Sequence, residues 1–317
     1  MRRSARTPST SPTSAPEFIA RLREARSRDG REVTDEDKHH IHEAIDRLFD
    51  LQKYPFMVLE LASSVSEEQV ADVFVRINSK GTPLNQADFI LTLMSVFWDD
   101  GRRELEAFCR EARQPSVAGP SPYNHFLTPD PDHLLRVSVA RGFKRARLQH
   151  VYSLLRGKDL ETGRFSDERR DAQFALLKDS QSQTLSLQNR HDFTKVPLEA
   201  GFRSAAMLSS RTALLYAYAH YLIGHLDHGV ERHRLRSLMA RWLFFTQLTG
   251  RYTSSPESIM EQDLGRLADV SDAAAFEAHL QAIIDQTLSE DFWSIALPNE
   301  LATSAGRNPA LSPTGRR

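Results

Sequence analysis

The sequence predicts a mainly α-helical, multi-helix protein with a small α/β portion near its N-terminus. Apolar residues recur at spacings of three and four along most of the chain, which places them on one face of a helix. Only residues 56–61, a short apolar run preceded by Pro55, have the pattern of a strand. A chain of 317 residues, of which 40% are apolar, can bury a substantial core. Its length suggests two domains.

The N-terminal part begins with a segment that we exclude from the fold. Residues 1–16 are rich in Arg, Ser, Thr and Pro and lack an apolar stretch, so we expect a disordered tail and no secretory signal. Phe18, Ile19 and Leu22 then predict a short helix. Thr34 and Asp37 resemble an N-cap, and they open a helix that we expect to reach about residue 52.

Two further helices should meet at the tight turn 79–83, because Gly81 suits a C-terminal cap and Pro83 prevents continuation. We assign 17–113 to one N-terminal domain. Residues 114–131, rich in Pro and Gly, should form the loop that marks the boundary. Residues 132–300 have helical periodicity and form the second domain, and 301–317 should be a loose tail.

Charge and cysteine content limit the function classes. The net charge of -1 provides no overall field toward nucleic acid or membrane, so any basic surface must be local. The single cysteine, Cys109, cannot form an internal disulfide or a cysteine metal cluster, which predicts a reducing compartment such as the cytoplasm. No apolar run is long enough to span a bilayer, so we expect no membrane association.

Residues 73–88 contain the most informative motif. Arg76 and Asn78 leave the end of one helix beside Gly81, directly before a new helix N-terminus that could receive an anion. Arg76, Asn78 and Gly81 are therefore candidates for an anion site. The alternative is an ordinary helix–turn–helix corner with a solvated arginine.

Three segments carry a resemblance to a known family. Phe-Val-Arg-Ile-Asn-Ser-Lys-Gly-Thr-Pro-Leu, at 74–84, is similar to the Phe-x-x-Ile-Asn-x-x-Gly-x-x-Leu motif of GmrSD-type restriction endonucleases, whose N-terminal domain is related to ParB and sulfiredoxin folds. A second motif at 242–258, which begins Trp-Leu-Phe-Phe-Thr-Gln, resembles the same proteins. So does Leu-Pro-Asn-Glu-Leu-Ala-Thr-Ser-Ala at 297–305. The resemblance covers about 36–310.

The resemblance implies a nucleotide-dependent DNA endonuclease that uses an NTP and a divalent metal ion. In that family an Asp-Gly-Gln-Gln-Arg motif serves nucleotide hydrolysis, and a C-terminal HNH-type part cleaves DNA. Neither motif is found in this sequence. What the resemblance leaves is one wall of the nucleotide pocket, with Arg76, Asn78 and Gly81 on it. We therefore assign no catalytic residue and no cofactor to this chain, and expect a truncated or split restriction protein of phage defence. Its partners would be DNA and a complementary or intact GmrSD-type polypeptide.

A second candidate site is a basic segment in the helical domain. Arg141, Lys144, Arg145 and Arg147 surround Phe143 and could neutralise phosphates of a nucleic acid. The alternative is a solvated helix face whose charge is balanced by acidic residues.

Histidines and carboxylates invite a metal hypothesis, which we do not adopt. His225 and His228 have the spacing of two ligands on one helix face, but a transition-metal site needs a third or fourth ligand. Glu257 and Glu261 are four residues apart, yet Ser255-Pro256-Glu257 is also an ordinary helix start. We predict no metal site.

Three functional hypotheses follow. The first is a remnant or split piece of a GmrSD-type restriction system. The second is a standalone helical interaction or regulatory protein derived from that scaffold. The third is an enzyme with an unrecognised site, which would need convergent ionisable groups around a pocket.

Overall fold

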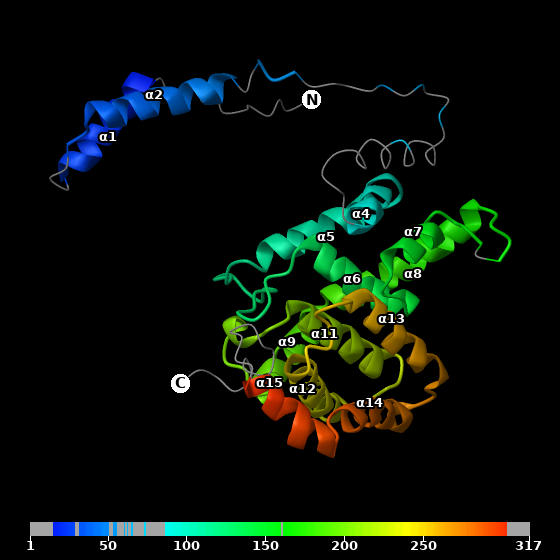
Figure 1. Cartoon of the computed structure of the whole chain (residues 1–317). Coiled ribbons are helices and arrows are strands. Elements are labelled where there is room, and N and C mark those ends of the chain that lie inside the picture. Colours follow the sequence, from blue (N-terminus) through cyan, green and yellow to red (C-terminus); the bar gives the residue numbers. More distant parts are fainter. Residues whose placement is uncertain are drawn as a thin grey trace. The chain divides into compact units, whose positions relative to one another are not determined.

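The computed structural model describes residues 15–28, 32–50, 53–55, 86–159 and 161–302, together with positions 60, 62, 65 and 73. These residues are mainly α-helical, which confirms the predicted fold class (Figure 1). Their β-type pairing is an isolated antiparallel bridge between Lys158 and Phe165. The strand predicted at 56–61, apart from Glu60, and the turn at 79–83 lie outside the described residues. So do residues 1–14 of the predicted tail 1–16 and residues 303–317 of the predicted tail 301–317. Residues 15–16 and 301–302, predicted to be loose, are instead helical.

Contacts divide the chain into two compact units, residues 1–63 and 64–317. The first contains α1 (Ala15–Arg28) and α2 (Asp35–Asp50), the blue helices of Figure 1. Thr34 and Asp37 form the predicted cap: each side chain accepts a hydrogen bond from the other's backbone N at 3.1 Å. Arg26 also donates to Asp37 at 2.7 Å, which ties the two helices together.

The second unit is a sequence of helices joined mostly by short connections. Its elements are α4 (Gln86–Phe97), α5 (Asp99–Glu111), α6 (Pro131–Phe143), α7 (Leu148–Leu155), α8 (Asp167–Leu185), α9 (Leu187–Phe193), α10 (Lys195–Glu199), η2 (Ala205–Met207), α11 (Arg211–Leu226), α12 (Arg232–Leu248), α13 (Pro256–Arg266), η3 (Leu267–Asp269), α14 (Ala273–Thr287), η4 (Phe292–Ala296) and α15 (Leu297–Ala302). Among these, none of the described helices is long and apolar enough to cross a membrane.

Two hydrophobic clusters fill this unit, and α6 contributes to both. Leu134 and Leu135 pack with α4, α5, α7 and α8, whereas Val137 and Ala140 pack with α11, α12 and α14. α11 is buried on almost every side. An all-round apolar helix of this kind occupies the centre of a helical domain.

The domain boundary predicted at 114–131 does not separate two packed units. Leu105 and Cys109 of α5 share a cluster with Leu134 and Leu135 of α6, across that loop. α4 and α5 are short, and short helices depend on tertiary packing for their stability. Helices α4 and α5 therefore pack in one core with α6, α7 and α8, which follow the loop. Burial raises the pKa of Cys109 to about 12, so this thiol is a packed side chain.

Two helices have features that periodicity alone does not give. Helix α6 ends at Phe143 and α7 follows it, because Lys144 adopts a left-handed conformation (φ 53°). In α4, the apolar side chain of Val96 is 51% exposed. The buried face of α4 instead consists of Ala87, Ile90, Leu93 and Met94.

Candidate functional site

The predicted wall of a nucleotide pocket, Arg76, Asn78 and Gly81, lies outside the described residues. The helix after this motif is described. It begins at Gln86, whose side-chain oxygen accepts a hydrogen bond from the backbone N of Gln149 at 3.1 Å. The start of α4 is thus held against α7, and the nucleotide pocket stays a prediction.

The predicted basic segment forms the turn between α6 and α7, and its first two cations are paired. Arg141 donates to Asp179 of α8 at 2.6 Å and lies 3.5 Å from Asp227, at the end of α11. The Lys144 ammonium lies 2.5 Å from Asp227 and 2.5 Å from the backbone oxygen of Arg141. These contacts connect α6 to α8 and α11.

The second half of the basic segment is organised by Glu261 of α13. One carboxylate oxygen accepts from Arg145 at 2.7 Å, and the other accepts from the backbone N of Ala146 at 2.6 Å and of Arg147 at 3.0 Å. Arg147 also donates to the hydroxyl of Ser258 at 3.3 Å. Burial acts to raise the pKa of Glu261, but these donors outweigh it and hold the pKa below 4.5. Glu261 is therefore the acceptor that fixes this turn.

A groove of about 680 Å³ lies beside the turn. Its charged lining combines Arg141, Lys144 and Arg145 with Asp227 and Glu261, and its apolar lining includes Leu176, Leu264, Leu267 and Val270. His228 also lines it, and burial is the main cause that lowers the pKa of this imidazole. Three cations and two carboxylates nearly cancel, so the groove has little net charge.

This pairing bears on the nucleic-acid interpretation. A phosphate gains most from a cation whose charge is not already used. Here Arg141, Lys144 and Arg145 each hold a carboxylate, so a phosphate would have to displace it. The contacts favour the alternative stated above, in which acidic residues balance the segment.

The second motif of the family resemblance, 242–258, spans the end of α12 and the start of α13, and its polar residues serve packing. Arg251 makes a two-point ion pair with the fully buried Asp263, at 2.5 and 3.1 Å. Tyr252 donates to the same carboxylate at 2.7 Å. The Arg251 guanidinium lies over the rings of Trp242 and Phe245, at 5.8 and 5.6 Å. This motif is a buried clamp between α12 and α13.

Other polar residues of the motif also hold neighbouring segments. Gln247 accepts hydrogen bonds from the hydroxyl of Ser209 and the backbone N of Ser210, which fixes the start of α11. Glu257 pairs with Arg136 of α6. Glu257 and Glu261 thus bind different arginines and do not form a carboxylate pair.

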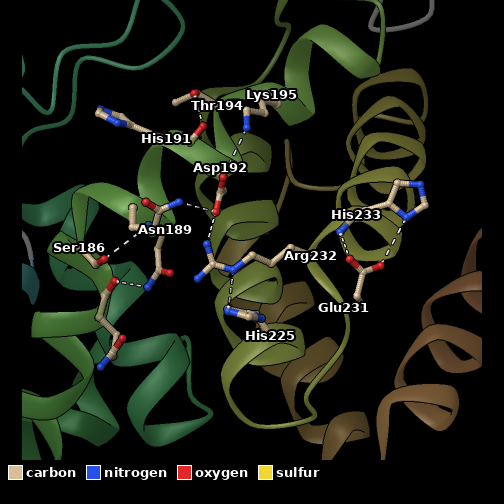
Figure 2. A network of polar contacts seen from close by, with 12 residues as sticks. Ser186, Asn189, His191, Asp192, Thr194, Lys195, His225, Glu231, Arg232 and His233 are labelled. Atoms are coloured by element: carbon tan, nitrogen blue, oxygen red, sulfur yellow. Dashed lines mark hydrogen bonds and ion pairs between the residues drawn. The ribbon is translucent and has the colours of Figure 1, made fainter. Parts of the chain in front are cut away.

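The histidines of α11 are also used structurally. Figure 2 shows Arg232 between Asp192 and His225: its Nε donates to His225 at 3.1 Å and its Nη1 pairs with Asp192. His220 is fully buried, and its Nδ1 donates to the backbone oxygen of Tyr216 at 2.9 Å. Within the described ranges, no group of three or more His, Cys, Asp or Glu residues could hold a metal ion.

Sequence reasoning missed Arg190, which anchors the Pro-rich loop. This side chain is buried and donates to the backbone oxygens of Pro122 at 2.8 Å and Leu127 at 3.1 Å. Burial lowers the pKa of its guanidinium. A lone arginine on a short helix has no pattern that would reveal its acceptors, because both are backbone groups of a distant loop.

No family model, curated protein or solved structure gives a significant match to this chain.

Proposed function

We propose that this chain is a helical scaffold component of a GmrSD-type restriction system, in which another polypeptide supplies nucleotide hydrolysis and DNA cleavage. The proposal starts from the similarity of 74–84, 242–258 and 297–305 to that family. Its main structural support is the clamp in which Arg251 and Tyr252 of the second motif hold Asp263 of α13. Arginine, tyrosine and aspartate are residue types that often act in catalysis. In this clamp they instead link the end of α12 to α13.

The experiment adds a polypeptide that carries the Asp-Gly-Gln-Gln-Arg segment and measures phosphate release from ATP and GTP. We expect hydrolysis only in the mixture, and Arg76→Ala or Asn78→Ala should abolish it. Arg103→Ala is the matched control, since this arginine is 70% exposed and pairs within its own helix. Absence of hydrolysis in the mixture, or equal loss in the control, would contradict the proposal.

A second candidate function, a standalone interaction or regulatory protein, is favoured by the C-terminal helical segment. Trp293 and Ile295 of η4 are 49% and 57% exposed, and Leu301 of α15 is 37% exposed. Exposed apolar residues close together in a chain are typical of a docking surface. In this case the chain should retain an intact GmrSD-type polypeptide in a pull-down at physiological salt, without hydrolysis.

The two functions differ in the effect of substitutions. Trp293→Ala with Ile295→Ala should release the partner if the C-terminal segment is the docking surface. Leu198→Ala, at an apolar residue of α10 that is 41% exposed, is the control. Retention by the double variant would remove the support for this second function.

A further inference from the structure

The α1–α2 hairpin buries Ile19 but leaves several of its large apolar side chains exposed. None of the 16 residues of α2 is buried, although its apolar positions 41, 45, 48 and 49 follow a helical period. Leu48 is 64% exposed, and Phe18 of α1 is 46% exposed. Helices of this length are marginally stable in water without tertiary packing. Among the described residues of this unit, Leu48 and Phe18 therefore have little apolar packing.

The charges of α1 and α2 indicate which partner could cover these exposed side chains. The sequence of α1 has four arginines and two glutamates, whereas that of α2 has six carboxylates and two cations. Within the hairpin the two helices are joined by the Arg26–Asp37 pair. A second hairpin placed antiparallel to the first would set a basic helix against an acidic one at both new contacts. The complementary surface is therefore present in another copy of the same chain.

We propose that the α1–α2 hairpin is a self-association module through which two copies of this chain form an antiparallel four-helix bundle. In that bundle α1 of one copy packs against α2 of the other. Leu48, Phe49 and Phe18 then enter a shared apolar core, as inward-facing positions do in helical bundles. This inference is independent of the proposed restriction function, since it uses neither family motif.

The test is sedimentation velocity of the full chain over a concentration series. We expect a reversible monomer–dimer equilibrium. Leu48→Glu should raise the dissociation constant at least about tenfold, because each dimer loses two buried leucine side chains. Leu48→Met conserves apolar volume and should change it little. Far-UV circular dichroism of each variant establishes that helix content is retained.

Two further variants complete the test. Leu198→Glu places the same charge on an exposed apolar residue of the second unit and should leave the dimer intact. Arg23→Glu reduces the charge difference between the helices, so it should weaken the dimer more at low than at high salt. A monomer at every concentration would overturn the inference. So would a dimer that Leu198→Glu disrupts and Leu48→Glu does not.

Discussion

Asp263→Asn should destabilise the second unit strongly. The Asp263 side chain is fully buried, and that of Arg251 is only 16% exposed. Asparagine preserves size and can still accept from Tyr252, but it removes the charge that offsets the buried guanidinium. Burial alone acts to lower the pKa of Arg251, and the hydrogen bonds and charge of Asp263 reverse this and raise it.

The magnitude follows from this geometry. Breaking a buried ion pair by removing one partner costs about 3–5 kcal/mol. The partial exposure of Arg251 places the expected loss at the low end, about 3 kcal/mol. Asp167→Asn is the matched control. Its ion pair with Arg170 has a similar length, 2.8 Å, but the carboxylate side chain is 85% exposed. Such a surface pair contributes at most about 1 kcal/mol.

The assay is urea unfolding at pH 7 followed by far-UV circular dichroism, with a double-mutant cycle through Arg251→Met. The double variant should lose less free energy of unfolding than the sum of the losses in the two single variants, because it leaves no unpaired charge in the core. A loss below about 1 kcal/mol for Asp263→Asn, or strict additivity of the cycle, would refute the clamp.

Three other predictions concern single buried or half-buried groups. Arg190→Lys should lower the free energy of unfolding by about 2 kcal/mol and increase proteolysis of residues 114–131. The reason is that an ammonium cannot replace the planar donors that hold two backbone oxygens. An unchanged cleavage rate would contradict this. Stability should fall as pH decreases from 6.5, by up to about 1.4 kcal/mol per unit, because burial lowers the pKa of His220 and the unfolded chain binds the proton more readily. His220→Gln should flatten that slope, and an identical slope would exclude His220 as its source. Glu261→Gln should be less stable than the unaltered protein at pH 7. The difference should shrink as the pH falls below 4.5, since the pKa of Glu261 is lowered in the fold. A difference that does not shrink with falling pH would contradict the assignment.

The sequence predicts the helices well where periodicity and caps coincide. Thr34 and Asp37 mark the start of α2, and Ser255-Pro256-Glu257 marks the start of α13. It does not predict the break at Lys144, because a left-handed lysine has no local preference that announces it. The break depends on long-range contacts, above all the three hydrogen bonds that converge on Glu261.

The candidate sites were also predictable only where nearby residues determine them. The sequence shows that Arg141, Lys144 and Arg145 are close in the chain. The net charge around them, however, depends on distant carboxylates, namely Asp179, Asp227 and Glu261. The closeness of these cations in the chain was therefore predictable, but the groove that they line and its near neutrality were not. The same holds for Arg190, whose acceptors lie more than 60 positions away.

The placement of polar and apolar groups directs the search for function toward surfaces. In the described part of the second unit, the most distinctive charged groups, such as Asp263 and Arg190, bind other parts of the same chain. Among the described residues, Leu48 on α2 and Trp293 and Ile295 on η4 are large apolar side chains that are about half exposed or more. Burying one such side chain contributes about 1.5–3 kcal/mol. Association with another protein, of the same or a different sequence, is therefore one way in which this chain can gain free energy.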